Sequence, residues 1–90
     1  MNPTVRRVAR YFDIPEAVLL GPSRTAHIAN ARQIAMYLLY TKKGYTLFST
    51  GEELDRNTHT VWHGVRRIKA LLRAGDAETL HDLAALKEEA

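Results

Sequence analysis

Two apolar-faced segments that flank a short one constrain the fold of this chain more than any other feature. The first includes residues 31–39, the short segment follows Thr46, and the last begins with small polar residues around Thr58. Apolar residues at intervals of three and four are typical of helices that bury one face. A long helix, a short helix and a helix that begins with small polar side chains form the layout of a helix-turn-helix. The pattern therefore predicts a domain that reads base edges in the major groove of DNA.

Pattern and punctuation predict five or six helices and no strand. Asn2 is suited to cap a first helix over residues 3–12, because Pro3 fits the first helical position. Proline and glycine bound a short second helix over residues 15–20, and a loop over residues 21–27 follows. The remaining predicted elements are a central helix through residues 28–39 that stops at Gly44, a short helix capped by Thr46, a turn at residues 55–57, a strong helix from Asn57 or Thr58 through Leu72, and a weaker helix over residues 77–88.

The charge of the chain is divided between its two parts. Residues 1–75 hold 12 Lys and Arg against five acidic residues, a formal charge of +7, whereas residues 76–90 have a formal charge of −4. A basic body of this kind can displace counterions from a duplex and gain a salt-sensitive affinity. A solvated surface of a small protein accounts for the charge as well, so charge alone leaves both interpretations open.

Composition excludes several classes of protein. No apolar run approaches the roughly 18–20 residues of a membrane span, and no apolar signal-peptide core follows Met1, so we expect a cytoplasmic protein. Without cysteine there is no disulfide framework, and the helical pair His59 and His63 lacks an acidic third ligand nearby. No phosphate-binding glycine loop or nucleophile–base pair is present. We expect no enzyme activity, no metal and no cofactor.

The order of three motifs resembles a known family. Residues 32–36 read Arg-Gln-Ile-Ala-Met, residues 8–12 read Val-Ala-Arg-Tyr-Phe, and Leu19-Leu20 follows. Together with the helix-turn-helix pattern, these motifs resemble the C-terminal DNA-binding domain of the bacterial chromosomal replication initiator DnaA. The resemblance covers roughly residues 3–73. It implies an all-α domain over residues 1–75 that is similar to the DnaA C-terminal and Trp-repressor-like folds. The charge and leucine spacing of residues 76–90 separately predict an acidic helix that packs on the core or serves association. Its apolar stripe is expected to hold Leu80, Leu83 and Leu86, and its outward side Glu78, Asp82, Glu88 and Glu89.

Four positions depart from the family pattern. Ala31 stands where the family usually has proline, the loop keeps Arg24 but little other positive charge, and Thr50 replaces an apolar residue. The family turn Gly-Gly-Arg-Asp-His-Thr-Thr-Val appears as residues 55–61, one residue shorter and with His and Thr exchanged. The fold tolerates these changes, whereas the base sequence that is read can differ.

The resemblance assigns base-reading roles to four residues. Arg24 matches a loop arginine that enters the minor groove, where a guanidinium suits the negative potential of a narrow, AT-rich groove. Asn57, Thr58 and His59 match positions that touch base edges in the major groove. Helix capping is the alternative role of Asn57 or Thr58, and it does not exclude a base contact.

Further residues match positions that touch the DNA backbone. The resemblance implies that Arg32, Gln33 and Thr60 fix the register of the protein on the phosphates. A solvated helix face is the alternative for Gln33. Arg66 can reach a phosphate from the outer face of its helix. We expect Trp62 to be a half-buried packing residue rather than a stacking platform.

Double-stranded DNA is the partner that these residues predict. As an excised domain of an initiator, the chain would recognise initiator boxes at a replication origin. As a free-standing bacterial or phage-encoded protein of the nucleoid, it would act by occupancy, as a regulator or a competitor, since these 90 residues contain no ATPase module. The rival interpretation is a protein-interaction adaptor in replication or transcription control that docks an initiator or regulatory partner. The sequence leaves the oligomeric state open.

Overall fold

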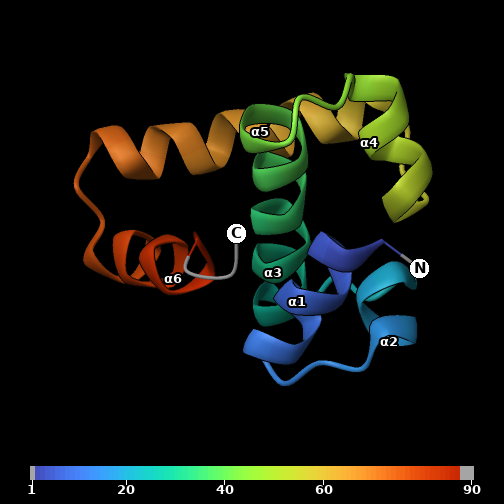
Figure 1. Cartoon of the computed structure of the whole chain (residues 1–90), viewed down its shortest axis with the longest axis horizontal. Helices are drawn as coiled ribbons and strands as arrows, with labels where there is room; N and C mark the ends of the chain where they lie inside the picture. The colour runs from blue at the N-terminus through green and yellow to red at the C-terminus, as the bar shows by residue number, and fades with distance from the viewer. Residues whose placement is uncertain (1, 88–90) are drawn as a thin grey trace.

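Helix α3 (Ala26–Tyr37) is the central element, and the first, second, fourth and fifth α-helices of the chain pack against it (Figure 1). The computed structural model describes residues 2–87, and these contain six α-helices, one π-helical turn and no strand. The predicted all-α fold is confirmed. The elements are α1 (Pro3–Tyr11), α2 (Glu16–Leu20), α3 (Ala26–Tyr37), η1 (Leu38–Lys42), α4 (Leu47–Leu54), α5 (Thr58–Arg73) and α6 (Ala77–Lys87).

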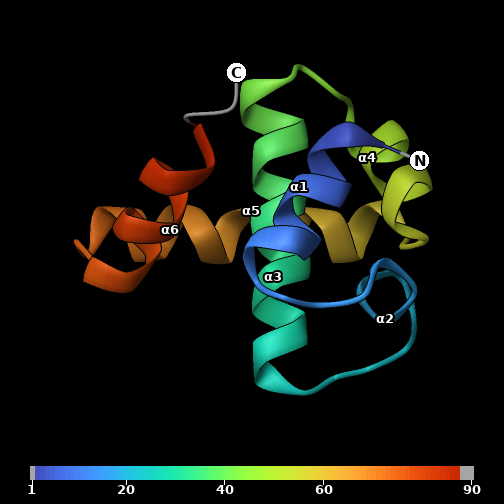
Figure 2. The ribbon, with the colours of Figure 1, turned by 60° about the horizontal axis from the view of Figure 1, so that its bottom comes forward.

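Helices α3 and α5 form the most extensive helix pair, and α5 crosses α3 steeply in both views (Figures 1 and 2). Gly64 of α5 lies at the crossing, where an added Cβ would sit 2.5 Å from Met36 Sδ and 3.1 Å from Gln33 Cγ. A glycine there lets the two backbones approach closely. The core on either side of this contact includes the fully buried Ile34 and Ile68.

The first helix is fixed at its start by a local cap. The Asn2 side chain accepts hydrogen bonds from the backbone N–H groups of Thr4 (2.9 Å) and Val5 (3.2 Å), and Pro3 occupies the first turn. Asn2 Nδ2 also donates to the Tyr45 hydroxyl at 3.0 Å, which ties the N-terminus to the segment before α4. The predicted cap is confirmed.

The central helix ends in a way that periodicity did not predict. Residues Leu38–Lys42 form the π-helical turn η1, in which Lys43 N–H donates to the Leu38 carbonyl. Gly44 follows with φ +76°, a conformation that suits glycine, so the expected stop is confirmed. The wider turn directs the chain from α3 toward α4.

Helix α6 has its inward face rotated from the one we expected. An apolar stripe of Leu80, Leu83 and Leu86 predicted that Asp82 points outward, but Asp82 is 8% exposed and Leu80 is 48% exposed. The physical reason is a hydrogen-bond donor on α1: the Tyr11 hydroxyl donates to Asp82 Oδ1 at 2.7 Å. Leu86 is buried as expected. The expected outward positions of Glu88 and Glu89 lie outside the described residues.

Helix α6 lies on one side of α3 along the long axis of the molecule, whereas α2 and α4 lie on the other (Figures 1 and 2). It packs against α1 and α5. Through residue 87 no helix is long and apolar enough to cross a lipid bilayer.

Candidate nucleic-acid interface

Helices α4 and α5 and the turn between them form a helix-turn-helix. Its first helix opens with a reciprocal cap, in which Ser49 N–H donates to Thr46 Oγ1 at 2.9 Å and Thr46 N–H donates to Ser49 Oγ at 3.0 Å. The expected cap at Thr46 is confirmed. Two donors at the start of α4 are thereby satisfied by side chains.

The turn between α4 and α5 depends on a glycine and a left-handed residue. A Cβ at Gly51 would collide with the carbonyl oxygen of Arg56. The backbone N–H of Arg56 in turn donates a hydrogen bond to the Gly51 carbonyl at 2.9 Å. Asp55 ends α4 with φ 55° and ψ 48°, a region that most L-residues avoid. The predicted turn at residues 55–57 is therefore present, and its tightness fixes the angle between the two helices.

Asn57 caps the second helix, as its alternative role predicted. Its Oδ1 accepts a hydrogen bond from Thr60 N–H at 2.8 Å. The amide nitrogen of Asn57 takes no part in that bond, so capping leaves it available to a ligand. Thr58 and Thr60 are exposed in the first turn, where the N–H groups of a helix favour an anion such as phosphate.

The exposed face of α5 continues beyond His59. Residues at intervals of three and four from His59 share this face, which holds Trp62, His63 and Arg66. The Nε2 atoms of His59 and His63 lie 3.0 Å apart, and the Arg66 guanidinium lies 4.5 Å from the centre of the Trp62 ring. This face is a continuous row of aromatic and basic side chains.

Trp62 is 41% exposed, and its ring contacts His63 and Arg66 at the surface. Sequence reasoning assigned it to packing and gave His63 no role. The same helical spacing that connects His59 to Arg66 would have placed both residues on the outer face.

The loop before α3 meets the helix-turn-helix at a shared hollow. Arg24 is exposed in that loop and lines a hollow of about 580 Å³ together with Arg32, Arg56 and Thr60. Asp55 is the single acidic side chain among the lining residues. The hollow is therefore positively charged, and it joins two segments that lie more than 30 residues apart in the sequence.

Arg32 and Arg56 bind the same stretch of backbone at the end of α2. Arg32 Nε donates to the Leu19 carbonyl at 2.8 Å and its Nη2 donates to the Gly21 carbonyl at 3.2 Å. Arg56 Nη1 donates to the Leu20 carbonyl at 3.3 Å, and its Nη2 donates to the same Gly21 carbonyl. Two guanidinium groups thus hold the start of the Arg24 loop, one from α3 and one from the turn.

The environment of Arg32 differs from the one that the resemblance implied. Its side chain is 6% exposed, and burial, assisted by the charge of Arg56, lowers the pKa of its guanidinium. Much of its hydrogen-bonding capacity is already used by carbonyl groups. Sequence reasoning gave Arg56 no role, and no local pattern indicates one, because its acceptors Leu20 and Gly21, at the end of α2, lie 36 and 35 residues away.

Gln33 joins α3 to α5. Its Oε1 accepts from Arg67 Nη1 at 2.8 Å, and the same nitrogen donates to Asn30 Oδ1 at 2.9 Å. Gln33 is partly buried. Its amide oxygen therefore belongs to a network between the two helices rather than to a freely solvated face.

Potential metal ligands do not gather in the part of the chain that the structure describes. No three His, Asp or Glu side chains among residues 2–87 lie close enough to hold one ion. His59 and His63 lie together without a third such group.

Comparison with known proteins identifies relatives over most of the chain. A family model described as the bacterial dnaA protein helix-turn-helix matches residues 4–68. Two curated proteins, both named chromosomal replication initiator protein DnaA, come from Thermomicrobium roseum and a Bradyrhizobium species. The first is 39% identical over an alignment of 87 residues, and the match covers 92% of this chain and 19% of the relative. The second is 40% identical over 86 residues, which cover 93% and 18%, so the chain spans less than a fifth of either relative.

Proposed function

This chain belongs to the bacterial DnaA helix-turn-helix family, and from that premise we propose that it binds a defined double-stranded DNA sequence. In this proposal the start of α5 enters the major groove, and Arg24 enters the adjacent minor groove. Family membership supports DNA binding as such. The proposal extends it to the roles of particular side chains and to a site similar to the boxes that a replication initiator recognises.

The hollow shared by Arg24 and Thr60 is the observation that carries the proposal. Arg24 comes from the loop before α3 and Thr60 from the first turn of α5, yet both line one hollow of about 580 Å³. A protein that reads both grooves must hold its minor-groove element beside its recognition helix. The hydrogen bonds of Arg32 and Arg56 to the Gly21 carbonyl supply such a connection.

The first turn of α5 carries side chains suited to base edges. The amide of Asn57 can pair with adenine, Thr58 offers a hydroxyl and a methyl group, and His59 can donate to a guanine or thymine acceptor. All three are exposed. Thr60 is assigned to a phosphate, since it lies at the N-terminus of the helix.

The next two turns extend the proposed major-groove contact. Trp62 presents an apolar surface that suits a thymine methyl group, and His63 can donate a hydrogen bond. Arg66 lies over the Trp62 ring, an arrangement that holds its guanidinium on the outer face, where a phosphate can accept from it.

Arg32 and Gln33 are assigned here to positioning, since both already bind neighbouring protein groups. Arg32 holds the end of α2, and Gln33 accepts from Arg67 between α3 and α5. A direct phosphate contact by either residue, as the resemblance implied, stays a prediction. The salt dependence of the variants described in the Discussion separates the two roles for Arg32.

Selection of binding sites from a random duplex library tests the assignment. We expect Arg24→Ala to lose an AT preference at one flank and His59→Ala to change a base in the core, each at ~1–3 kcal/mol. Lys69→Ala is the matched control, because Lys69 is exposed on α5 beyond the proposed contacts. It should recover the wild-type motif. Recovery of that motif at wild-type affinity by both Arg24→Ala and His59→Ala would contradict the assigned roles.

A further inference from the structure

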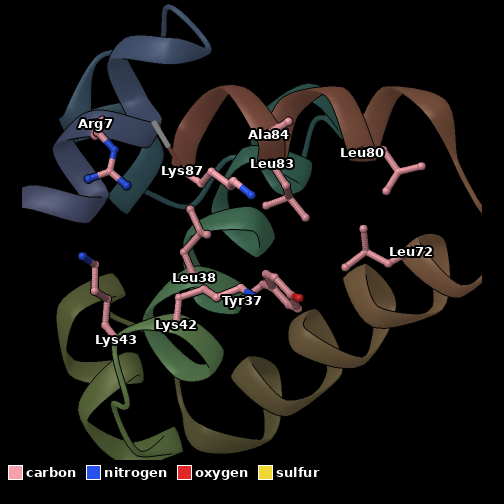
Figure 3. Close-up of a pocket in the computed structure, with 10 residues that line it drawn as sticks. All are labelled: Arg7, Tyr37, Leu38, Lys42, Lys43, Leu72, Leu80, Leu83, Ala84 and Lys87. Atoms are coloured by element: carbon pink, nitrogen blue, oxygen red, sulfur yellow. The ribbon is translucent and has the colours of Figure 1, made fainter. Parts of the chain in front are cut away.

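A second hollow lies between α6 and the end of α3, away from the proposed DNA interface (Figure 3). Its volume is about 460 Å³, within the range of roughly 300–1,000 Å³ that ligand pockets occupy. The elements α2 and α4, beside the Arg24 hollow, lie on the other side of α3 (Figure 1). Four leucines line it, Leu38, Leu72, Leu80 and Leu83, and basic side chains lie beside them.

The lining of this hollow is divided into an apolar part and a basic part. Leu72 and Leu80 face each other at one end, Arg7 and Lys43 lie toward the other, and the side chains of Lys42 and Lys87 extend between the two ends (Figure 3). Among residues 2–87, no acidic residue lines the hollow. In the same range the structure gives Lys42, Lys43 and Lys87 no ion pair. The hollow thus combines apolar walls with three lysines that have no acidic partner among the described residues.

The exposed Leu80 follows from the way α6 packs. Because Asp82 turns toward Tyr11, Leu80 cannot join the buried face and remains 48% exposed at the rim of the hollow. A leucine so placed loses favourable burial unless something covers it. We propose that the hollow is a docking site for an acidic amphipathic helix of a protein partner, which inserts apolar side chains between Leu72 and Leu80 and pairs carboxylates with Lys42, Lys43 and Lys87.

The chemistry of the hollow favours this occupant over two others. A DNA duplex presents phosphates but no apolar side chains to fill the space between Leu72 and Leu80. A membrane surface needs apolar residues that protrude into the lipid, whereas these line a depression. An amphipathic helix carries apolar side chains on one face and charges beside them, which matches both parts of the lining.

The test uses a labelled peptide of about 14 residues with leucines at positions i, i+3, i+4 and i+7 and glutamates at most others, a pattern that places its apolar face on one side of a helix. We expect this peptide to shift the amide resonances of Leu80, Leu83 and Leu38 in the full chain and to leave those of Thr58 and His59 unchanged. A peptide of the same composition with a scrambled order should not produce these shifts. Shifts confined to α5 and the Arg24 loop would overturn the proposal.

Matched variants identify the groups responsible. Anisotropy titration should show affinity for the peptide falling ~10-fold in the double variant Lys42→Glu/Lys43→Glu and several-fold in Leu80→Ser. Arg10→Glu/Lys69→Glu, an equal double charge reversal at exposed positions of α1 and α5 outside the hollow, should change it less than ~2-fold. Equal losses in this control and in the double lysine variant would reduce the effect to net charge and overturn the proposal.

A duplex titration separates this proposal from the proposed DNA function. Leu80→Ser should bind DNA as the wild type does, and Arg24→Ala should bind the peptide as the wild type does. Vesicles of phosphatidylglycerol and phosphatidylcholine serve as the competing ligand. If the vesicles shift the Leu80 and Leu83 resonances while the peptide does not, the hollow is a lipid site and the proposal fails.

Discussion

The two hollows of this domain use positive charge in different ways. Beside the helix-turn-helix, Arg32 and Arg56 are bound to backbone carbonyl groups at the end of α2. Beside α6, Lys42 and Lys43 lie next to an apolar surface, and neither forms an ion pair with any of residues 2–87. Guanidinium groups with several fixed donors can orient a loop, whereas lysine ammonium groups on flexible stems adapt to a partner. Similar local charge thus holds a loop at one end of the domain, and at the other end we propose that it attracts a partner.

Gly51→Ala is the strongest test of the backbone geometry beside the helix-turn-helix. An added Cβ would collide with the rigid backbone carbonyl of Arg56, so we expect a loss of at least ~3 kcal/mol in the free energy of unfolding, together with weakened DNA binding. Gly64→Ala should cost less, because its nearest neighbour is the flexible end of Met36. Urea denaturation of both variants measures this order, and the reverse order would contradict the assigned turn geometry.

Arg32→Ala tests whether Arg32 acts mainly by holding the backbone at the end of α2 or by contacting a DNA phosphate. Removal of hydrogen bonds from a buried guanidinium should lower the free energy of unfolding by ~2 kcal/mol. DNA affinity is expected to fall through misplacement of the Arg24 loop, with an unchanged slope of log affinity against log salt concentration. A slope smaller by ~1 would restore the phosphate contact that the family resemblance implied.

Arg56→Ala is the counterpart of Arg32→Ala, because both arginines donate to the Gly21 carbonyl. The variant removes the bonds from the turn to Leu20 and Gly21 but leaves Arg32 on α3. Site preference at the AT flank should weaken while the major-groove core of the motif persists. Loss of the core preference with the flank intact would show that Arg56 serves the recognition helix instead of the loop.

Asp55→Gly and Asp13→Gly form a matched pair that distinguishes strain from charge. Both residues have positive φ, 55° and 57°, and glycine should relieve ~1 kcal/mol at each. Asp55 lines the arginine-rich hollow and Asp13 does not. Thermal melting should therefore rise in both variants, whereas duplex titration should show tighter binding only for Asp55→Gly. Equal DNA affinities of Asp55→Gly and Asp13→Gly would show that Asp55 does not contribute to the DNA interface.

The smallest expected effect concerns the end of the domain that carries α6. The hydrogen bond to Asp82, followed by desolvation and the charge of Asp82, raises the pKa of Tyr11 above its ordinary value of 10.0. A raised pKa favours the protonated phenol, so this contribution to stability is present below pH 10 and is lost as pH rises through the folded-state pKa. Tyr11→Phe should destabilise the domain by about 1 kcal/mol at pH 7 and flatten the alkaline limb of its stability profile.

DNA affinity at pH 7 should be unchanged in Tyr11→Phe, because the Tyr11–Asp82 pair lies outside the Arg24 hollow. Denaturation between pH 7 and 11 checks the stability profile. An alkaline limb as steep as that of the wild type would mean that another group controls it.

Features encoded within a few residues were predictable from the sequence. The caps at Asn2, Thr46 and Asn57 act on N–H groups two to three positions away, and they are present as expected. The helices and the turn of the helix-turn-helix follow from local periodicity and punctuation, and the family from the motifs that accompany them. The end of α3 is the local exception, because its π-helical turn leaves the periodicity of the sequence almost unchanged.

The destinations of long polar side chains depended on the tertiary structure. Arg56 reaches carbonyl groups 35 and 36 residues away, and Tyr11 reaches Asp82 across 71 residues. A helical pattern indicates which residues share a face, but a buried polar group is stable only where a distant partner satisfies it. The sequence by itself therefore determined the helices and the family of this protein. Packing decided which arginines hold a loop, which acid of α6 turns inward and where Leu80 stays exposed, because each outcome depends on partners brought together by the fold.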